Sequence, residues 1–147
     1  MMNPRDFLNL ASDLVMGNGE ADWRSGASRA YYAAFHVARD LLQSFGFAVP
    51  RADTAHAYLW MRLSNCGHPD VEKAGEDLDE MRTIRNTADY DPHWPFLQKW
   101  GIDQVDTALR VIAVLDAVAA APHIRTAITE AMKLYERNVL KNVTWHP

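Results

Sequence analysis

A long apolar stripe between Glu20 and Phe45 constrains the fold of this chain more than any other feature. Apolar residues recur at steps of three or four, with adjacent pairs that widen the stripe: Trp23, Ala27, Ala30, Tyr31, Ala34, Phe35, Ala38, Leu41, Leu42 and Phe45. This spacing follows the period of an α-helix, so these side chains would share one helix face. Gly46, with Pro50 beyond it, is a typical end for such a helix. The segment is therefore predicted to be one long amphipathic helix.

Glycine and proline divide the rest of the chain into further helical segments. Asn3 and Pro4 are typical of a helix start, and the Gly-Asn-Gly run at 17–19 would end that helix. We expect further helices over about residues 52–66, 69–90, 103–121 and, beyond Pro122, 122–140, with a frayed tail at 141–147. No repeat, β-alternating run or second domain is visible. The sequence predicts a single all-α domain, residues 1–147, built as an antiparallel bundle of five to six helices.

Composition and charge agree with one globular domain. The chain has 147 residues, of which 48% are hydrophobic and 23% charged. A net charge of −4 argues against strong sequence-independent adhesion to nucleic acid. It leaves room for a local basic cleft, because eleven of the fifteen basic residues are Arg, whose guanidinium forks suit phosphate.

Metal and cofactor sites are not expected. The lone Cys66 excludes an intrachain disulfide and a Cys-based zinc site. No Glu is followed three residues later by His, as di-iron bundles require, and glycine motifs that cradle phosphate are absent. The acid-rich segment 72–80 suits the start of a helix and is interpreted as a solvated face.

Nothing in the sequence indicates a membrane or secreted protein. The first residues lack the layout of a signal peptide. The longest apolar run, 111–121, is interrupted by Asp116 and falls short of the roughly 20 residues that a spanning helix needs. We expect a cytoplasmic protein without membrane contact.

Polar side chains at helical spacing form two candidate binding stripes. The first lies beside the apolar stripe of the long helix and holds Arg29, Tyr32, His36 and Arg39. The second lies near the end of the predicted 69–90 helix and holds Arg82, Arg85, Asn86 and Asp89, with Tyr90 directly after them. Two guanidiniums, an amide and a phenol grouped in this way could bind a phosphodiester. In the alternative interpretation the arginines pair with nearby acids, such as Asp79 or Asp89, and His36 is a structural histidine.

Three segments resemble the HEPN (higher eukaryotes and prokaryotes nucleotide-binding) family. The run ASRAYYAAFH at 27–36 resembles the long helix of these proteins, and MRTIRNTADYD at 81–91 resembles a later signature of one branch. Thr54-Ala55-His56 lies about where that branch has a Thr-His pair. Order and separation also fit, so the resemblance covers roughly residues 5 to 120.

The resemblance implies a small helical bundle that dimerises and places a polar cleft between the two copies of its fourth helix. It also implies a metal-independent ribonuclease, acting as a toxin or in phage defence and often encoded with a minimal nucleotidyltransferase as antitoxin. The catalytic signature of the family is Arg, often with a following polar residue, and then His after four to six intervening residues. Arg85 and Asn86 match its first half.

The second half of the signature departs from the family pattern. After four intervening residues the histidine position holds Tyr90, and the next histidine, His93, follows after seven. Metal-free RNA cleavage needs a base for the 2′-hydroxyl and a group that stabilises charge on the phosphate. Arg85 can fill the second role, whereas Tyr90 is a poor base at neutral pH but can donate a proton or orient the phosphate. His36 is an alternative base only if its face lines the same cleft.

Three functions therefore stay open. The first is a ribonuclease toxin with Arg85 and Tyr90 in catalysis. The second is a catalytically silent module that binds nucleotide or RNA and partners a nucleotidyltransferase or another protein. The third is a bundle with no nucleotide role.

Overall fold

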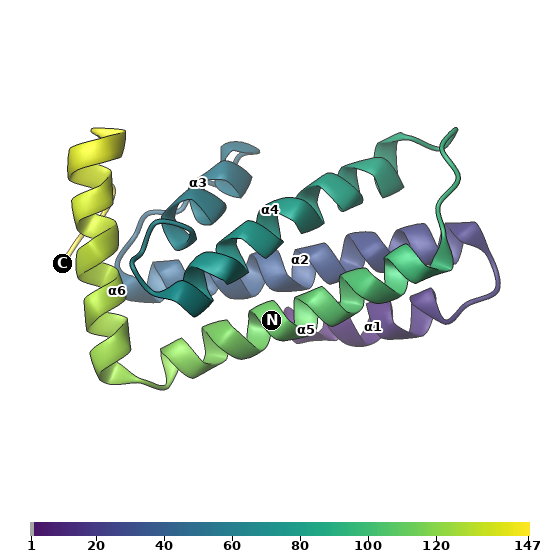
Figure 1. Ribbon diagram of the computed structural model, residues 1–147, viewed down its shortest axis with the longest axis horizontal. Helices are drawn as coiled ribbons and strands as arrows, with labels where there is room; N and C mark the ends of the chain where they lie inside the picture. The colour runs from purple at the N-terminus through teal and green to yellow at the C-terminus, as the bar shows by residue number, and fades with distance from the viewer. Residues whose placement is uncertain (1) are drawn as a thin grey trace.

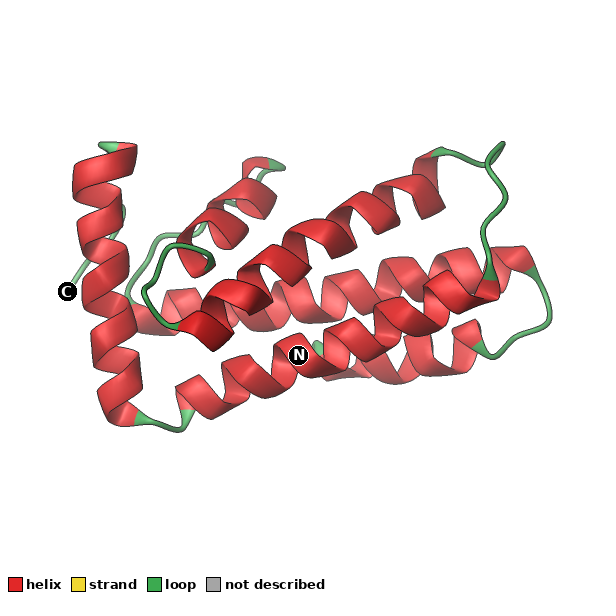
Figure 2. Ribbon diagram, in the orientation of Figure 1, coloured by secondary structure: helices red, strands yellow, loops and turns green. Residues whose placement is uncertain are grey.

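The computed structural model describes residues 2–147 as a bundle of helices (Figure 1). The helices are α1 (Arg5–Val15), α2 (Glu20–Phe45), α3 (Thr54–Leu63), α4 (Pro69–Tyr90), α5 (Gln98–Ala119) and α6 (Pro122–Tyr135), which continues into a short π-helix, η1 (Glu136–Leu140). α1, α2, α4 and α5 run along the long axis, and α6 stands across one end (Figure 1). Within the described part of the chain there is no strand, only one isolated bridge between Phe47 and Trp145 (Figure 2). The predicted all-α bundle is confirmed.

α2 is the central helix and contributes more buried residues to the core than any other helix described. Its bounds match the prediction from the apolar stripe, and Tyr31 and Leu42 on that stripe are almost completely buried. The helix ends at Gly46, whose φ of 106° lies in the left-handed region that glycine tolerates without strain. Gly26 lets α1 approach closely, because a Cβ there would lie 2.5 Å from Cγ1 of Val15. α2 therefore serves as the packing surface for α1, α4 and α5.

α5 begins five residues earlier than the predicted start at Asp103. Two tertiary contacts explain the early start. Nε2 of Gln98 donates to the carbonyl oxygen of Val15 at 2.9 Å, and Gly101 packs so closely that a Cβ would lie 2.9 Å from Cγ1 of Val15. Neither contact leaves a local signal in the sequence.

The tail is bound to the bundle, so the prediction that residues 141–147 are frayed is wrong. The amide of Ala48 donates to the carbonyl oxygen of Thr144 at 3.2 Å, and the indole of Trp145 donates to that of Phe45 at 2.7 Å. Glu136 anchors the turn before them: its buried carboxylate accepts from Arg62 at 2.9 Å and from the amide of Thr144 at 2.9 Å. Partners distant in sequence therefore hold a segment that looks unstructured locally.

The acid-rich first half of α4 is mostly solvated, with one exception. Asp77 is buried and pairs with Lys73, so it does not belong to the solvated face that we expected. Glu72 also has a local role, because its carboxylate accepts from the amide of Gly67 at 3.1 Å. Among residues 2–147 no group of three or more His, Cys, Asp or Glu side chains is arranged to hold a metal ion.

Over the described residues, no helix taken singly has the length and apolar character needed to cross a membrane. α5 and the segment Pro122–Leu140 reach that length and composition only together, and they are bent by 103° at their junction.

Candidate functional site

Arg85 lies between tyrosines from two helices. It is buried on α4, with 5% of its surface exposed. Its guanidinium carbon is 5.5 Å from the ring centroid of Tyr31, 5.1 Å from that of Tyr32 and 5.8 Å from that of Tyr90. Rings at these distances stabilise a cation through their negative faces and can replace part of its lost hydration. The structure thus places Arg85 beside Tyr90, as the helical spacing suggested, and adds the two tyrosines of α2.

The guanidinium of Arg85 is only loosely neutralised. Its Nη1 is 3.8 Å from a carboxylate oxygen of Asp89, and that same oxygen accepts from the hydroxyl of Ser28 at 3.0 Å. Nη1 also lies 3.5 Å from the hydroxyl of Tyr90, at the outer limit of a hydrogen bond. The predicted alternative, in which Arg85 simply pairs with a nearby acid, therefore describes only one weak contact.

Two buried donors in this region have no partner. Nε of Arg82 and Nε of Arg85 are both inaccessible, and within residues 2–147 neither makes a hydrogen bond. Leaving such a group unpaired costs about 1–3 kcal/mol, and more when it is charged. Arg82 also forms no ion pair with the described residues. Two arginines one helical turn apart thus hold unused donors where anion oxygens could satisfy them.

His56, on α3, joins these residues although it was not among the predicted site residues. Its Nδ1 lies 2.5 Å from the hydroxyl of Tyr31, and the two rings stack with centroids 5.6 Å apart. Burial, together with the charges of Arg82 and Arg85, lowers the pKa of His56 below its ordinary value. The only sequence signal was the Thr54-Ala55-His56 run of the family resemblance. We call the residues gathered here the arginine–tyrosine site: Arg82, Arg85, Asp89, Tyr90, Tyr31, Tyr32 and His56.

Three other predicted residues lie away from Arg85. Arg29 and His36 turn toward α1, where both contact the ring of Phe7, at 5.6 Å and 5.9 Å respectively. Burial and the charge of Arg39 lower the pKa of His36. Tyr32 and Phe35 connect the two regions. The ring centroid of His36 is 6.2 Å from that of Tyr32 and 5.2 Å from that of Phe35, and the ring centroid of Phe35 lies 4.8 Å from that of His56. His93 is exposed in the loop after α4.

Asn86, the remaining predicted residue, is half-buried on α4 next to Arg85. Its side chain makes no hydrogen bond within the described part of the chain. The amide of Asn86 is therefore next to the site and is not engaged in a hydrogen bond that holds the fold together.

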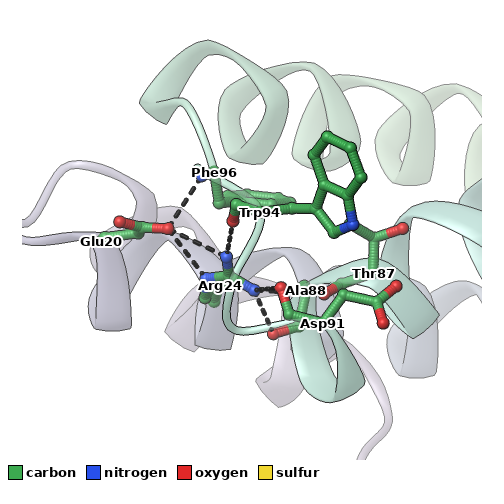
Figure 3. A network of polar contacts seen from close by, with 7 residues as sticks. All are labelled: Glu20, Arg24, Thr87, Ala88, Asp91, Trp94 and Phe96. Atoms are coloured by element: carbon green, nitrogen blue, oxygen red, sulfur yellow. Dashed lines mark hydrogen bonds and ion pairs between the residues drawn. The ribbon is translucent and has the colours of Figure 1, made fainter.

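Arg24 closes the end of α4 and was also missed by sequence reasoning (Figure 3). Its Nη1 donates to the carbonyl oxygens of Thr87 and Ala88, both at 3.1 Å, and of Asp91 at 3.2 Å. Its Nη2 donates to Trp94 in the following loop and, at 2.9 Å, to the carboxylate of Glu20. A helix end leaves carbonyl oxygens unpaired, and a cation is the partner that the helix dipole favours there. This network fixes the last turn of α4, which carries Asp89 and Tyr90.

A comparison with known proteins identifies the family of this chain. A family model described as HEPN domain matches residues 4–121, which contain α1 to α5 and every residue of the arginine–tyrosine site. No curated protein and no solved structure matches the chain. The match covers most of the chain and supports a nucleotide- or RNA-related module. The chain therefore belongs to the HEPN domain family.

Proposed function

We propose that this protein binds a phosphodiester of a nucleotide or RNA at the arginine–tyrosine site. The observation that carries the proposal is the pair of buried, unpartnered Nε donors of Arg82 and Arg85 within the described residues. A phosphate oxygen is a strong, negatively charged acceptor, so it would offset the two guanidinium charges, and a turn of each guanidinium would bring its buried Nε–H group to that oxygen. The weak contact with Asp89 leaves Arg85 free to take this role.

Exposed aromatic side chains support a nucleotide rather than a simple anion as the ligand. Tyr90 is 70% exposed and Trp94, four residues later, is 68% exposed. Bases of single-stranded nucleic acid stack on such rings, and the stacking contributes about 1–3 kcal/mol per base. Arginine N–H groups could bind the phosphate of a nucleotide, and the exposed rings beside them could stack on its base.

Metal-independent RNA cleavage, as in a toxin or defence ribonuclease, is the second candidate function. It is favoured by the hydroxyl of Tyr90, which lies 3.5 Å from Nη1 of Arg85 at the exposed edge of the site. There the phenol could donate a proton to the leaving 5′ oxygen while Arg85 stabilises charge on the phosphate, and the attacking 2′-hydroxyl would lose its proton to water. In the catalytically silent alternative the same groups bind RNA without cutting it.

We also propose that the protein forms a homodimer. A groove of about 310 Å³ beside α4, lined by Thr83, Ile84, Thr87, Phe96 and Trp100, exposes apolar surface that a second copy could cover. Light scattering should give twice the mass of the chain, and a monomer would remove the shared cleft. A minimal nucleotidyltransferase as partner is a proposal that co-purification of the two proteins would test.

The decisive experiment measures RNA binding and RNA cleavage in the presence of EDTA. We expect the wild type to bind single-stranded RNA and Arg85→Ala to lose most of that binding while keeping its fold. Arg110→Ala is the matched control, because Arg110 is exposed on α5 and, among the described residues, donates only to Thr107. Equal RNA binding by wild type and a folded Arg85→Ala would contradict the proposal.

Tyr90 variants separate the two candidate functions. If the phenol takes part in cleavage, Tyr90→Phe should cut more slowly but bind as before. Tyr90→His restores the histidine position of the family signature, so a gain of cleavage over an inactive wild type would identify the wild type as a binding module. Absence of cleavage in all variants would exclude the ribonuclease.

A further inference from the structure

We propose that His56 is the third cation of the phosphodiester site, and that it takes up a proton when the phosphodiester binds. This inference rests on the proposed function and deepens it. Arg85 and His56 contact the same ring: the Arg85 guanidinium lies 5.5 Å from the centroid of Tyr31, and His56 stacks on that ring at 5.6 Å. A phosphate held by Arg85 would therefore act on His56 across one aromatic ring.

The hydrogen bond with Tyr31 fixes the state of the free imidazole. Burial raises the pKa of Tyr31 above its ordinary value despite the opposing charges of Arg85 and Arg82, so the phenol keeps its proton. When the phenol donates, Nδ1 of His56 accepts, and the ring hydrogen of the neutral imidazole lies on Nε2. A proton taken up by His56 must go to Nδ1, and the phenol must then turn its hydroxyl and accept. Both partners can make this exchange without breaking their contact.

Burial first, and the surrounding charges second, favour the neutral form of the free histidine. Arg82 and Arg85 face it from α4, and after burial they contribute most to its lowered pKa. Asp53, at the start of α3, opposes them. Tyr31 and Phe35 face the ring from α2, with ring centroids 5.6 Å and 4.8 Å from that of His56, and Asp79 on α4 acts on Tyr31. Further along α3, Arg62 is already compensated by Glu136.

A bound phosphodiester would reverse this balance. One negative charge beside Arg82 and Arg85 offsets their part in lowering the pKa of His56, so the protonated form becomes more favourable than in the free protein. By linkage, a group whose pKa rises on binding strengthens binding as pH falls through the interval between the free and the bound pKa. Outside that interval the affinity should not depend on His56.

The test uses single-stranded oligouridylate and the full chain. Calorimetric titrations in two phosphate-free buffers of different ionisation enthalpy measure the protons taken up on binding. For the wild type we expect uptake of up to about one proton per site. The affinity should rise by up to about tenfold for each unit by which the pH is lowered within that interval. His56→Gln should still bind oligouridylate but without proton uptake. His36→Gln is the matched control, since His36 is also partly buried with a lowered pKa but contacts Phe7 instead.

A second measurement does not depend on the variants. The ring signals of His56, followed by NMR in the wild type, should titrate at higher pH with oligouridylate than without it. Binding without proton uptake, or an unchanged titration of His56, would overturn this inference while leaving the proposed function intact. If the wild type binds no oligouridylate at any pH, the proposed function fails and this inference fails with it.

Discussion

Nη1 of Arg24, in the second turn of α2, donates a hydrogen bond of 3.1 Å to the carbonyl oxygen of Thr87 in the last turn of α4. Thr87 lies two residues after Arg85. The same guanidinium binds the loop beyond α4, and Glu20 extends the network to the amide of Phe96, whose N–H donates at 2.8 Å (Figure 3). The position of Tyr90 relative to Arg85 thus depends on an arginine from another helix.

Replacing Arg24 should loosen this end of the molecule. Arg24→Ala removes the partner of several carbonyl oxygens at a helix end, so we expect the free energy of unfolding to fall by about 2–3 kcal/mol. The amide of Phe96 should exchange its hydrogen faster. Arg110→Ala should change stability by less than about 0.5 kcal/mol, because Arg110 is exposed and its one hydrogen bond with the described residues is to Thr107 on the same helix. Equal stability of the two variants would mean that the network does not hold α4.

Gly26→Ala should destabilise the contact between α1 and α2. Alanine within a helix normally stabilises relative to glycine by about 0.5–1 kcal/mol. Here the new methyl would meet Cγ1 of Val15 at 2.5 Å and the carbonyl oxygen of Ala11 at 3.1 Å, so overpacking should outweigh that gain by about 1–3 kcal/mol. Chemical denaturation measures the change, with Ser25→Ala as the exposed neighbour control.

A double variant checks the cause of that loss. If the clash with Val15 is responsible, Gly26→Ala should cost less in a Val15→Ala background than in the wild type. Strictly additive losses would point away from this contact.

The ion pair between Arg62 and Glu136 should be costly to break from one side. Both side chains are buried, with 4% and 0% of their surface exposed. Burial raises the pKa of Glu136, but the hydrogen bonds from Thr144 and Arg62 lower it by more. The net pKa is therefore below its ordinary value, and the carboxyl stays ionised at neutral pH. Glu136→Gln would leave the charge of Arg62 uncompensated and should cost about 3–5 kcal/mol, measured by denaturation.

Glu130→Gln is the matched control for Glu136→Gln. The Glu130 side chain is 62% exposed and pairs only with Lys133 on the same helix, so its loss should cost less than about 1 kcal/mol. Hydrogen exchange in the tail gives a second measurement. Glu136→Gln, but not Glu130→Gln, should increase exchange at the amide of Thr144, which donates a hydrogen bond to the Glu136 carboxylate. Similar losses for both variants would show that the buried pair contributes no more than a surface pair.

Stability should decrease in mild acid because of two histidines, the buried His56 and the partly buried His36. The pKa values of His36 and His56 are lowered in the folded chain, by burial first and by nearby arginines second. In the unfolded chain they return to about 6.5, so the unfolded state binds more protons below that pH. The free energy of unfolding should therefore fall as pH drops from about 6.5 toward the lowered values.

Thermal melts across this pH range measure that loss. Replacing either histidine by Gln should flatten the dependence, whereas His123→Gln, at an exposed position on α6, should leave it unchanged. A dependence that persists in the doubly substituted His36→Gln and His56→Gln chain would assign the acid sensitivity to other groups.

Local signals were enough to predict the helices that carry the site. α2 and α4 begin and end where the sequence indicated, because Gly46 ends the first and Pro69 and Pro92 lie at the ends of the second. The predicted start of α5 was wrong because Gln98 and Gly101 extend the helix through contacts with Val15, which the sequence does not show. The prediction of a frayed tail was wrong because the tail is held by Glu136 and the end of α2, and these partners can be recognised only in the folded chain.

The site was predictable only along single helices. Helical spacing grouped Arg82, Arg85 and Asp89 with Tyr90, since neighbours on one helix face can be read directly. Spacing could not show that Tyr31 would meet Arg85 from α2, or that His56 would arrive from α3. The role of Arg24 could not be predicted for another reason. Its partners are mostly backbone carbonyl oxygens, which every residue carries and which leave no pattern in the sequence.

The most direct test of the phosphodiester site observes the arginine donors themselves. NMR of the Nε–H groups, with and without single-stranded oligouridylate, follows Arg82 and Arg85 separately from the other arginines. The buried Nε–H groups of these two residues have no partner in the described chain, so we expect their signals to shift strongly on binding, while that of the exposed Arg110 stays in place. Binding of the RNA with unchanged Arg82 and Arg85 signals would contradict the account.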